Sequence, residues 1–262
     1  MINSVNIMHL LPFINDKRKA KIISSFEGED RVMYKQLNVF DICMLADGHG
    51  GSEVSNFLAE HLCESFTALY YALCYLHHMD VPNEYKKYID SFDNQIRTQL
   101  RKIDTSEQSN IIKNLLRITI NKLANKQAHV REGSTLVGFV RTRDYIITFN
   151  VGDSRCYALS KNDSLNLLTY DHTFKSSIER SRLNVASAKR RRLDGVLAMT
   201  RSIGDSDVPR SISNPTIRKR NLHDYSVLVL VSDGTYEYVN QNIFKHIIQQ
   251  SIDCNDNKFL SN

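Results

Sequence analysis

The run Leu45-Ala46-Asp47-Gly48-His49-Gly50-Gly51 follows an apolar stretch and precedes a helical pattern. A carboxylate at the end of a buried strand offers hard oxygen ligands to Mg²⁺ or Mn²⁺, and glycine lets a backbone carbonyl approach the ion closely. His49 adds a side chain that titrates near neutral pH. An Asp-Gly pair after a strand also forms ordinary turns, so this run alone leaves a metal site and a simple turn both open.

Two further apolar stretches end in the same way. Residues 227–231 are followed by Ser232-Asp233-Gly234, and residues 145–151 are followed by Gly152-Asp153-Ser154-Arg155. Three predicted strands therefore end with an aspartate beside a glycine. Carboxylates that converge at strand ends are the ligand set that a dinuclear site for hard cations needs, because one aspartate can bridge two ions while others complete each shell.

With these motifs the sequence resembles the metal-dependent serine/threonine protein phosphatases of type 2C, the PPM-type phosphatases. The motifs occur in the family's order: Asp47-Gly-His-Gly-Gly51, Gly133-Ser-Thr135, Asn150-Val-Gly-Asp-Ser-Arg155, Leu168-Thr-Tyr-Asp-His172, Leu197-Ala-Met-Thr-Arg-Ser-Ile-Gly-Asp205 and Ser232-Asp-Gly234. The resemblance covers the chain from about residue 20 to about residue 245. It implies an α/β sandwich (α+β) with two stacked, mainly antiparallel β-sheets flanked by helices, and a dinuclear metal site at the sheet ends.

The resemblance also implies a reaction and a set of metal ligands. Phosphoserine or phosphothreonine in a protein substrate is hydrolysed by a water held between two Mg²⁺ or Mn²⁺ ions, so no protein nucleophile is required. Asp47 bridges the ions, and the carbonyl of Gly48 completes one shell. Asp233 binds the second ion. Glu29 and Asp30 hold the first ion directly or through waters, although an ordinary turn is the alternative reading of this pair.

Two more side chains take roles by the same resemblance. His49 donates a proton to the leaving alkoxide as a general acid. Asp153, with Glu237 where the family usually has an aspartate, supports a weaker third ion. A structural turn, in which the carboxylate of Asp153 accepts a hydrogen bond from Arg155, is an equal alternative.

Three residues of the matched motifs receive no part in the chemistry. We expect Arg201 to order the neighbouring loops that carry aspartates rather than to contact substrate. We interpret His172 as a loop histidine and assign it no function. Asp205, which follows a glycine, is expected to act as a cap or a turn residue.

The sequence departs from the family pattern in two places. Ser25 stands where the family carries an arginine that grips the substrate phosphate, and Arg31, Arg18 and Lys21 are the candidates to replace it. Asp256-Asn257 comes about one helix too early for the family's last metal motif, and we interpret it as a chance match. Without the family's closing strand, we expect one edge of a sheet to be exposed. These departures keep a second hypothesis open, a catalytically weak or inactive pseudoenzyme that binds phosphoproteins or other partners.

The periodicity of apolar residues indicates the order of elements. Strands are predicted over 20–26 and 38–46, and a helix is predicted from residue 52 onward. Two more helical stripes run over 85–103 and 111–123, and short strands follow from residue 134. The polar segment 171–193 is expected to form the small flap beside the active site.

Composition limits the remaining possibilities. The 262 residues, 42% of them hydrophobic, suit a single domain. The resemblance places a phosphatase-like domain over 20–262, after an N-terminal extension over 1–19, and we expect it to lack the family's usual closing helix and strand. The net charge of +5 is too small to indicate nucleic acid, and the basic clusters lack interleaved aromatic residues. The resemblance implies a phosphorylated protein as the partner, while the oligomeric state stays open.

Location is inferred from cysteine usage and from apolar runs. Five cysteines without a C-x-x-C spacing suggest reduced thiols in the cytoplasm, with the nucleus left open by the cluster at 189–192. The apolar patch at 7–14 is broken by His9 and Pro12 and does not form a convincing signal peptide. No apolar run is long enough for a membrane span, so we expect no membrane association.

Overall fold

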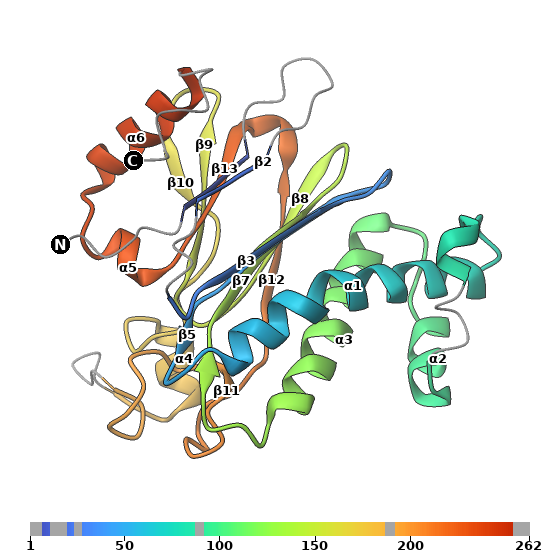
Figure 1. The fold of residues 1–262 in the computed structure, drawn as a ribbon, viewed down its shortest axis with the longest axis horizontal. Helices are drawn as coiled ribbons and strands as arrows, with labels where there is room; N and C mark the ends of the chain where they lie inside the picture. The colour runs from blue at the N-terminus through green and yellow to red at the C-terminus, as the bar shows by residue number, and fades with distance from the viewer. Residues whose placement is uncertain (1–6, 11–19, 24–27, 87–91, 187–191, 254–262) are drawn as a thin grey trace.

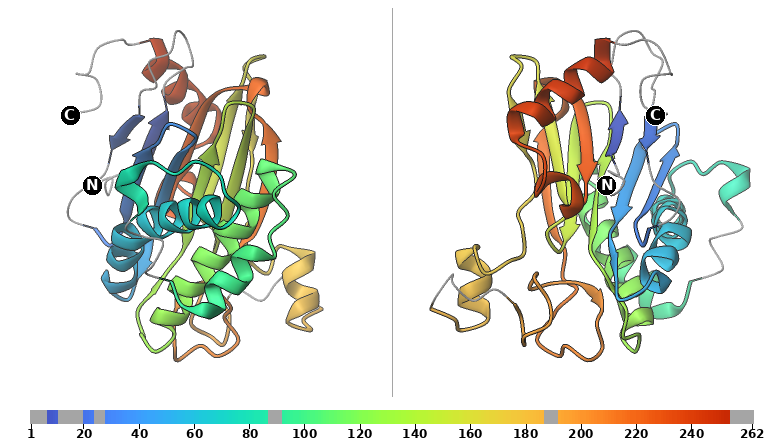
Figure 2. Two further views of the ribbon diagram at one scale, coloured as in Figure 1. Left: turned by 90° about the vertical axis from the view of Figure 1, so that its right-hand side faces the viewer. Right: turned by 60° about the vertical axis from the view of Figure 1, so that its left-hand side comes forward.

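The structure, a computed structural model, describes residues 7–10, 20–23, 28–86, 92–186 and 192–253. Two five-stranded sheets stack face to face, and helices cover their outer faces (Figure 1, Figure 2). The strand pairings within these sheets are antiparallel. The fold class expected from the sequence is therefore confirmed.

The first sheet has the strand order β12-β8-β7-β4-β3. Its strands are β3 (Arg31–Gln36), β4 (Asp41–Ala46), β7 (Leu136–Arg141), β8 (Tyr145–Val151) and β12 (Thr216–Asn221). A small sheet of β5 (Gly48–His49), β6 (Gly133–Ser134) and β11 (Ile203–Gly204) continues from the end of β4. This continuation carries the chain from Asp47 to His49.

The second sheet has the order β10-β9-β13-β1-β2. Its strands are β1 (Ile7–Leu10), β2 (Ala20–Ile23), β9 (Arg155–Ser160), β10 (Leu165–Leu167) and β13 (Tyr225–Val231). The sequence analysis left residues 1–19 outside the domain and expected an exposed sheet edge. In the structure β1 lies in that range and pairs with β13, so the backbone of β13 is flanked on both sides, by β9 and β1.

The two sheets are held together by alternate residues of their strands. Cys43 and Leu45 of β4 pack against Leu228 and Leu230 of β13 in one core between the sheets. The neighbouring residues of each strand face outward into other clusters, so both faces of β4 and β13 are buried. Because both faces are buried, these strands are continuously apolar rather than alternating. Burial of each leucine side chain contributes about 2 kcal/mol to stability.

Helices cover the outer faces of both sheets. The first sheet is covered by α1 (Glu53–Leu76) and α3 (Gln108–Gln127), which pack on residues of β4 and β8. The second sheet is covered by α6 (Gln241–Asp253), whose Phe244 and Ile248 contact the outer residues of β13. The remaining helices are α2 (Asn94–Arg101), α4 (Ser177–Arg182), α5 (Asp233–Tyr236) and a 3₁₀ turn at Leu222–Asp224.

Two elements differ from the sequence prediction. The helical stripe over 85–103 becomes the shorter α2, which begins after Asp93 because that carboxylate accepts a hydrogen bond from the backbone of Ile96 at 2.8 Å. No strand was predicted between the segments 20–26 and 38–46, but the structure has β3 there, at an edge of the first sheet. All but one of the residues of β3 are half-buried. Because neither face of this strand is fully buried, its sequence does not alternate clearly between apolar and polar residues, which is the pattern that predicts a strand.

The described residues include four of the five cysteines, and their helices can be checked for a membrane-spanning segment. Cys43, Cys63, Cys74 and Cys156 are buried, and no two of them form a disulfide. Cys254 lies outside the described residues. None of the described helices combines the length and apolar character that crossing a bilayer requires.

Candidate functional site

Four aspartates from separate parts of the chain meet at one end of the sandwich. Asp47 follows β4, Asp153 follows β8, Asp233 begins α5 after β13, and Asp30 lies before β3. The charges of Asp30, Asp233 and Asp153 all act on Asp47. We call these four residues the acidic cluster. The convergence of strand-end carboxylates expected from the sequence is thus present.

Asp47 lies at the centre of the acidic cluster. Burial, the neighbouring charges and a hydrogen bond with the carboxyl group of Asp30 raise its pKa to about 9. Its backbone is fixed, because its carbonyl accepts a hydrogen bond from the amide of Thr135 at 2.9 Å. The strongest electrostatic influences on Asp47 are therefore other carboxylates, and the carboxyl group is held among like charges.

Asp153 is the most buried member, with 7% of its surface exposed. Burial, followed by the charges of Asp233 and Asp171, raises its pKa to about 7. The charge of Glu237 acts in the same direction. Its Oδ1 atom is buried and has no hydrogen-bond partner, a costly state for a carboxylate oxygen in a protein interior.

The alternative reading of Asp153, as the acceptor for Arg155, is wrong. Arg155 instead forms a two-pronged ion pair with Asp171, with Nε–Oδ1 and Nη2–Oδ2 distances of 3.0 and 2.7 Å. Its guanidinium also lies 3.6 Å from the ring centroid of Tyr236, whose hydroxyl donates to the Asp153 carbonyl at 3.2 Å. Arg155 therefore fixes the backbone around Asp153 and α5 while leaving the Asp153 carboxylate unpaired.

Gly48 allows the turn of Asp30 to approach the end of β4. A Cβ at this position would lie 2.7 Å from the carbonyl oxygen of Glu29 and 2.9 Å from Oγ of Ser55. That Oγ donates to the Glu29 carbonyl at 2.5 Å, which ties the turn to α1. The side chain of Glu29 is exposed, so the structure brings the backbone of Glu29 and the carboxylate of Asp30 to the cluster.

Arg31 holds the same turn from its other side. Its Nη1 atom donates to the carbonyls of Gly28 and Asp30 at 2.7 and 2.8 Å, and its Nε donates to Asn56 of α1 at 2.5 Å. These donors are used within the protein, so Arg31 positions Asp30. Ser25 and Arg18, which the sequence analysis considered at the phosphate position, lie outside the described residues, as do Asp256 and Asn257. The side chain of Lys21 is likewise not described.

His49 is paired with Asp205, a partner that sequence reasoning missed. Its Nε2 atom lies 2.9 Å from Oδ2 and 3.1 Å from Oδ1 of Asp205. The carboxylate is 5% exposed and the imidazole 28% exposed, so the ring keeps access to the exterior. Asp205 also forms the expected turn, since it accepts from the amide of Val208 and has a positive φ of 51°. That φ after Gly204 aims its side chain at a residue 156 positions away.

His172 and Arg201 support the loops around the cluster. Nδ1 of His172 accepts from the amide of Gly152 at 3.0 Å, so the ring proton lies on Nε2 and is shared with Thr216 at 2.7 Å. Burial, then the charge of Arg201, lowers the pKa of His172 to about 3. Arg201 pairs with the buried Glu179 of α4 and donates to the carbonyl of Asn214. Both residues position backbone, as expected for Arg201.

The flap segment projects beside this end of the molecule. α4 and its flanking residues extend away from the sandwich in both views of Figure 2. Ser176 caps α4 by accepting from the amide of Glu179. Glu179 is 1% exposed, pairs with Arg182 of the same helix, and joins α4 to Thr200 and Arg201. The expected flap is therefore anchored at its base by one buried glutamate.

Comparison with known proteins identifies the family. A profile described as Protein phosphatase 2C matches residues 29–262. The rice (Oryza sativa subsp. japonica) protein named "Probable protein phosphatase 2C 21" is 30% identical over 79% of this chain and 64% of its own length. Human "Protein phosphatase 1A" is 25% identical over 80% of this chain and 53% of its own length. The chain thus spans less than two thirds of these relatives.

Solved structures share the fold. The crystal structure of a serine-threonine phosphatase 2C from Toxoplasma gondii superposes with a TM-score of 0.60 at 15% identity, over 97% of this chain and 85% of that one. A sex determining protein of C. elegans gives a TM-score of 0.65 at 19% identity, over 94% of this chain and 55% of that one. At such identities the likeness concerns the fold.

Proposed function

The chain belongs to the protein phosphatase 2C family, and on this premise we propose that it hydrolyses phosphoserine and phosphothreonine in proteins with the help of two Mg²⁺ or Mn²⁺ ions. The observation that carries the proposal is the acidic cluster. Burial, and then the charges of Asp30 and Asp233, raise the pKa of Asp47 to about 9. A divalent cation would relieve that repulsion, and the family's chemistry supplies one.

The residues present fit such ions by their chemistry. Asp47, Asp233 and Asp30 offer hard carboxylate oxygens, and the Gly48 carbonyl completes the set. The Oδ1 atom of Asp153, buried without a partner, is the ligand proposed for a third, weaker ion together with Glu237. As they stand, no three or more His, Cys, Asp or Glu side chains of the described residues are arranged around one ion position. The hydrogen bond between Asp47 and Asp30 would therefore have to open on binding.

The proposed reaction divides the work between the ions and the protein. Bound cations would neutralise the phosphate and lower the pKa of the attacking water. His49 donates a proton from Nδ1 to the leaving oxygen, because its Nε2 is engaged by Asp205. Asp205 fixes the orientation of the ring before that transfer. His172 and Arg155 keep the backbone beside Asp153 in place through the contacts described above.

The second hypothesis, a pseudophosphatase that binds phosphoproteins without hydrolysing them, rests on Ser25 and on Asp256-Asn257. These residues lie outside the described part of the chain. The carboxylates of the acidic cluster favour catalysis, since a protein that only binds partners gains nothing from burying like charges together.

Phosphate release from a phosphothreonine peptide tests the proposal. We expect Mn²⁺-dependent release by the wild-type protein and a loss of about a hundredfold or more in Asp233→Asn. Asp163→Asn is the matched control, because Asp163 pairs with Lys245 at the surface and its positive φ suits asparagine. Its activity should equal that of the wild type. A folded wild-type protein that binds Mn²⁺ in calorimetry and releases no phosphate would establish the pseudophosphatase instead.

A further inference from the structure

A second concave site lies between α2 and α3, outside the acidic cluster. It has a volume of about 670 Å³ and is lined from both helices and from the residues that follow α2. α2 lies on the side of the molecule opposite α5 and α6 (Figure 1). We call this site the α2/α3 groove. None of its lining residues belongs to the proposed phosphatase chemistry.

The two helices that form the groove are entirely free of acidic residues. α2 and α3 contain no Asp or Glu, while each carries arginine or lysine. Within the groove lie Lys102, Arg117 and Lys122, and none of them forms an ion pair with a carboxylate of the described residues. Asp93 is the acidic lining residue, and its carboxylate caps α2. The groove therefore presents a net positive charge to its surroundings.

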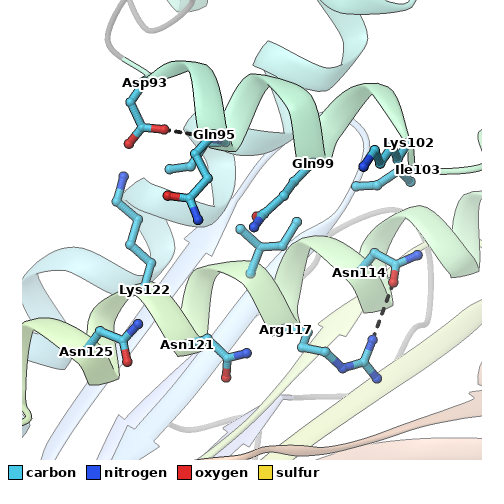
Figure 3. A pocket seen from close by; sticks show the side chains of 12 residues that line it. Asp93, Gln95, Gln99, Lys102, Ile103, Asn114, Arg117, Asn121, Lys122 and Asn125 are labelled. Carbon is cyan, nitrogen blue, oxygen red and sulfur yellow. Dashed lines mark hydrogen bonds between the residues drawn. The ribbon is translucent and has the colours of Figure 1, made fainter.

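The rest of the lining is suited to polypeptide backbone. Figure 3 shows Gln95 and Gln99 reaching from α2 toward α3, with Asn121 on the facing helix. Amide side chains offer both a donor and an acceptor, as extended backbone does. The stretch of α3 that lines the groove, 114–125, spans about 16 Å, the length of about five residues of extended chain.

The floor of the groove adds a weak apolar contact. Ile96 and Ile103 are buried, and Ile118 is half-buried. None of the described residues that line the groove is aromatic, and Lys122 lies 5.2 Å from the ring centroid of the neighbouring Phe92. Single-stranded nucleic acid binds by stacking bases on aromatic rings, so this lining favours a peptide over a nucleic acid.

From this arrangement we propose that the α2/α3 groove binds an extended segment, rich in Asp and Glu, of a partner protein. The three cations pair with acidic side chains, and the amides of Gln95, Gln99 and Asn121 hold the backbone. The overall net charge of +5 favours the encounter with an acidic partner. This binding is independent of hydrolysis at the acidic cluster.

Fluorescence anisotropy with a labelled peptide of alternating Glu and Ser tests the proposal. The comparison peptide has Gln in place of Glu. The groove variant is Lys102→Gln with Arg117→Gln and Lys122→Gln. The matched control removes three exposed cations elsewhere, by Arg143→Gln, Lys161→Gln and Lys175→Gln, so both proteins have the same net charge. Circular dichroism checks that each variant is folded.

We expect the acidic peptide to bind, with its affinity falling about tenfold in the groove variant and staying within about twofold in the control. Gln99→Ala with Asn121→Ala, which keeps every charge, should weaken binding about threefold. Equal losses in the groove variant and the control, or no preference for Glu over Gln, would overturn the proposal. Tighter binding of a single-stranded RNA oligonucleotide through the same three cations would overturn it in favour of nucleic acid.

Discussion

Two buried sets of carboxylates in this protein are treated in opposite ways. Glu179 at the base of the flap accepts hydrogen bonds from Arg201, Arg182 and Thr200, with Nε of Arg201 at 3.0 Å and Oγ1 of Thr200 at 2.8 Å. Burial alone would raise its pKa, but these hydrogen bonds and the charge of Arg201 hold the pKa below its usual value. At this position the arginine side chains of the protein neutralise the buried carboxylate.

Among the described residues, no arginine or lysine pairs with Asp47 or Asp153 in this way. The pKa of Asp47 rises to about 9 and that of Asp153 to about 7, through burial and then through neighbouring carboxylates. The arginine nearest to Asp153 in sequence, Arg155, binds Asp171 instead. In the described part of the chain, the buried Glu179 is therefore neutralised by arginines, whereas Asp47 and Asp153 pair with no cationic side chain. This difference supports the proposal that the acidic cluster binds a cation from outside.

Removing the charge of Glu179 should have the largest effect on stability. Glu179→Gln leaves the half-buried Arg201 and the more exposed Arg182 without this counter-charge, and we expect a loss of about 3 kcal/mol in the free energy of unfolding. The matched control is Asp194→Asn at the more exposed ion pair with Arg210, which should cost less than about 1 kcal/mol. Urea unfolding measures both. Equal losses would show that Glu179 is not specially compensated.

In the metal-free protein, Asp47→Asn is expected to increase the free energy of unfolding, whereas Glu179→Gln decreases it. The unfolded carboxyl group has a pKa near 3.8 and the folded one near 9, so the folded state binds an extra proton between these values. Stability of the wild type therefore falls as pH rises through this window. The asparagine removes this penalty, about 4 kcal/mol near pH 7, but weakens the hydrogen bond with Asp30 at a cost of about 2 kcal/mol, so the unfolding free energy should rise by about 2 kcal/mol. A destabilised variant would mean that repulsion among the carboxylates weighs less at Asp47 than the other contacts of its side chain.

Near the base of the flap, His172 should make the free energy of unfolding depend on pH. Its pKa falls from 6.5 to about 3 on folding, so the unfolded chain binds more protons below pH 6.5 and stability is lost as pH decreases. With Arg201, Arg182 and Glu179 as the charged groups acting on this ring, we expect a loss of about 1.4 kcal/mol by about pH 5.5. In His172→Gln the difference in unfolding free energy between pH 7.5 and 5.5 should shrink by about that amount. An unchanged pH dependence would exclude His172 as its source.

The smallest effect is expected at Arg155. Lysine keeps the charge but loses the two-pronged contact with Asp171 and the stacking on Tyr236, so Arg155→Lys should cost about 1 kcal/mol in unfolding free energy. Because the charge is retained, Mn²⁺ affinity should fall only through displacement of the Asp153 backbone. Thermal unfolding with and without Mn²⁺ separates these effects. A variant that loses all stabilisation by Mn²⁺ would place Arg155 closer to the ion site than its contacts indicate.

Much of the fold was predictable because its strands are continuous and apolar. β8 was predicted over its full range, and the aspartates after β4, β8 and β13 were correctly expected to converge. The edge strand β3 was missed because its residues are only half-buried. The start of α2 was missed because apolar periodicity continues through its cap at Asp93.

The candidate site was predictable in its motifs and not in its pairings. Asp205 was expected to form a turn, which it does, but its contact with His49 depends on a local φ of 51° and a long-range approach that no sequence spacing encodes. The partner of Arg155 was likewise not predicted, since the sequence analysis considered only Asp153, whereas the structure pairs Arg155 with Asp171, 16 residues away. Local patterns determined the elements, while tertiary contacts determined which charges meet.

Calorimetric titration of the metal-free protein with Mn²⁺ tests most directly whether the acidic cluster is a cation site. The wild type should bind Mn²⁺ and release protons in doing so, because the raised pKa values of Asp47 and Asp153 leave protons to be displaced near pH 7. Asp47→Asn should bind at least about a hundredfold more weakly, whereas Asp163→Asn should match the wild type. Equal Mn²⁺ binding by the wild type and Asp47→Asn, both folded, would contradict the assignment of these carboxylates to a metal site.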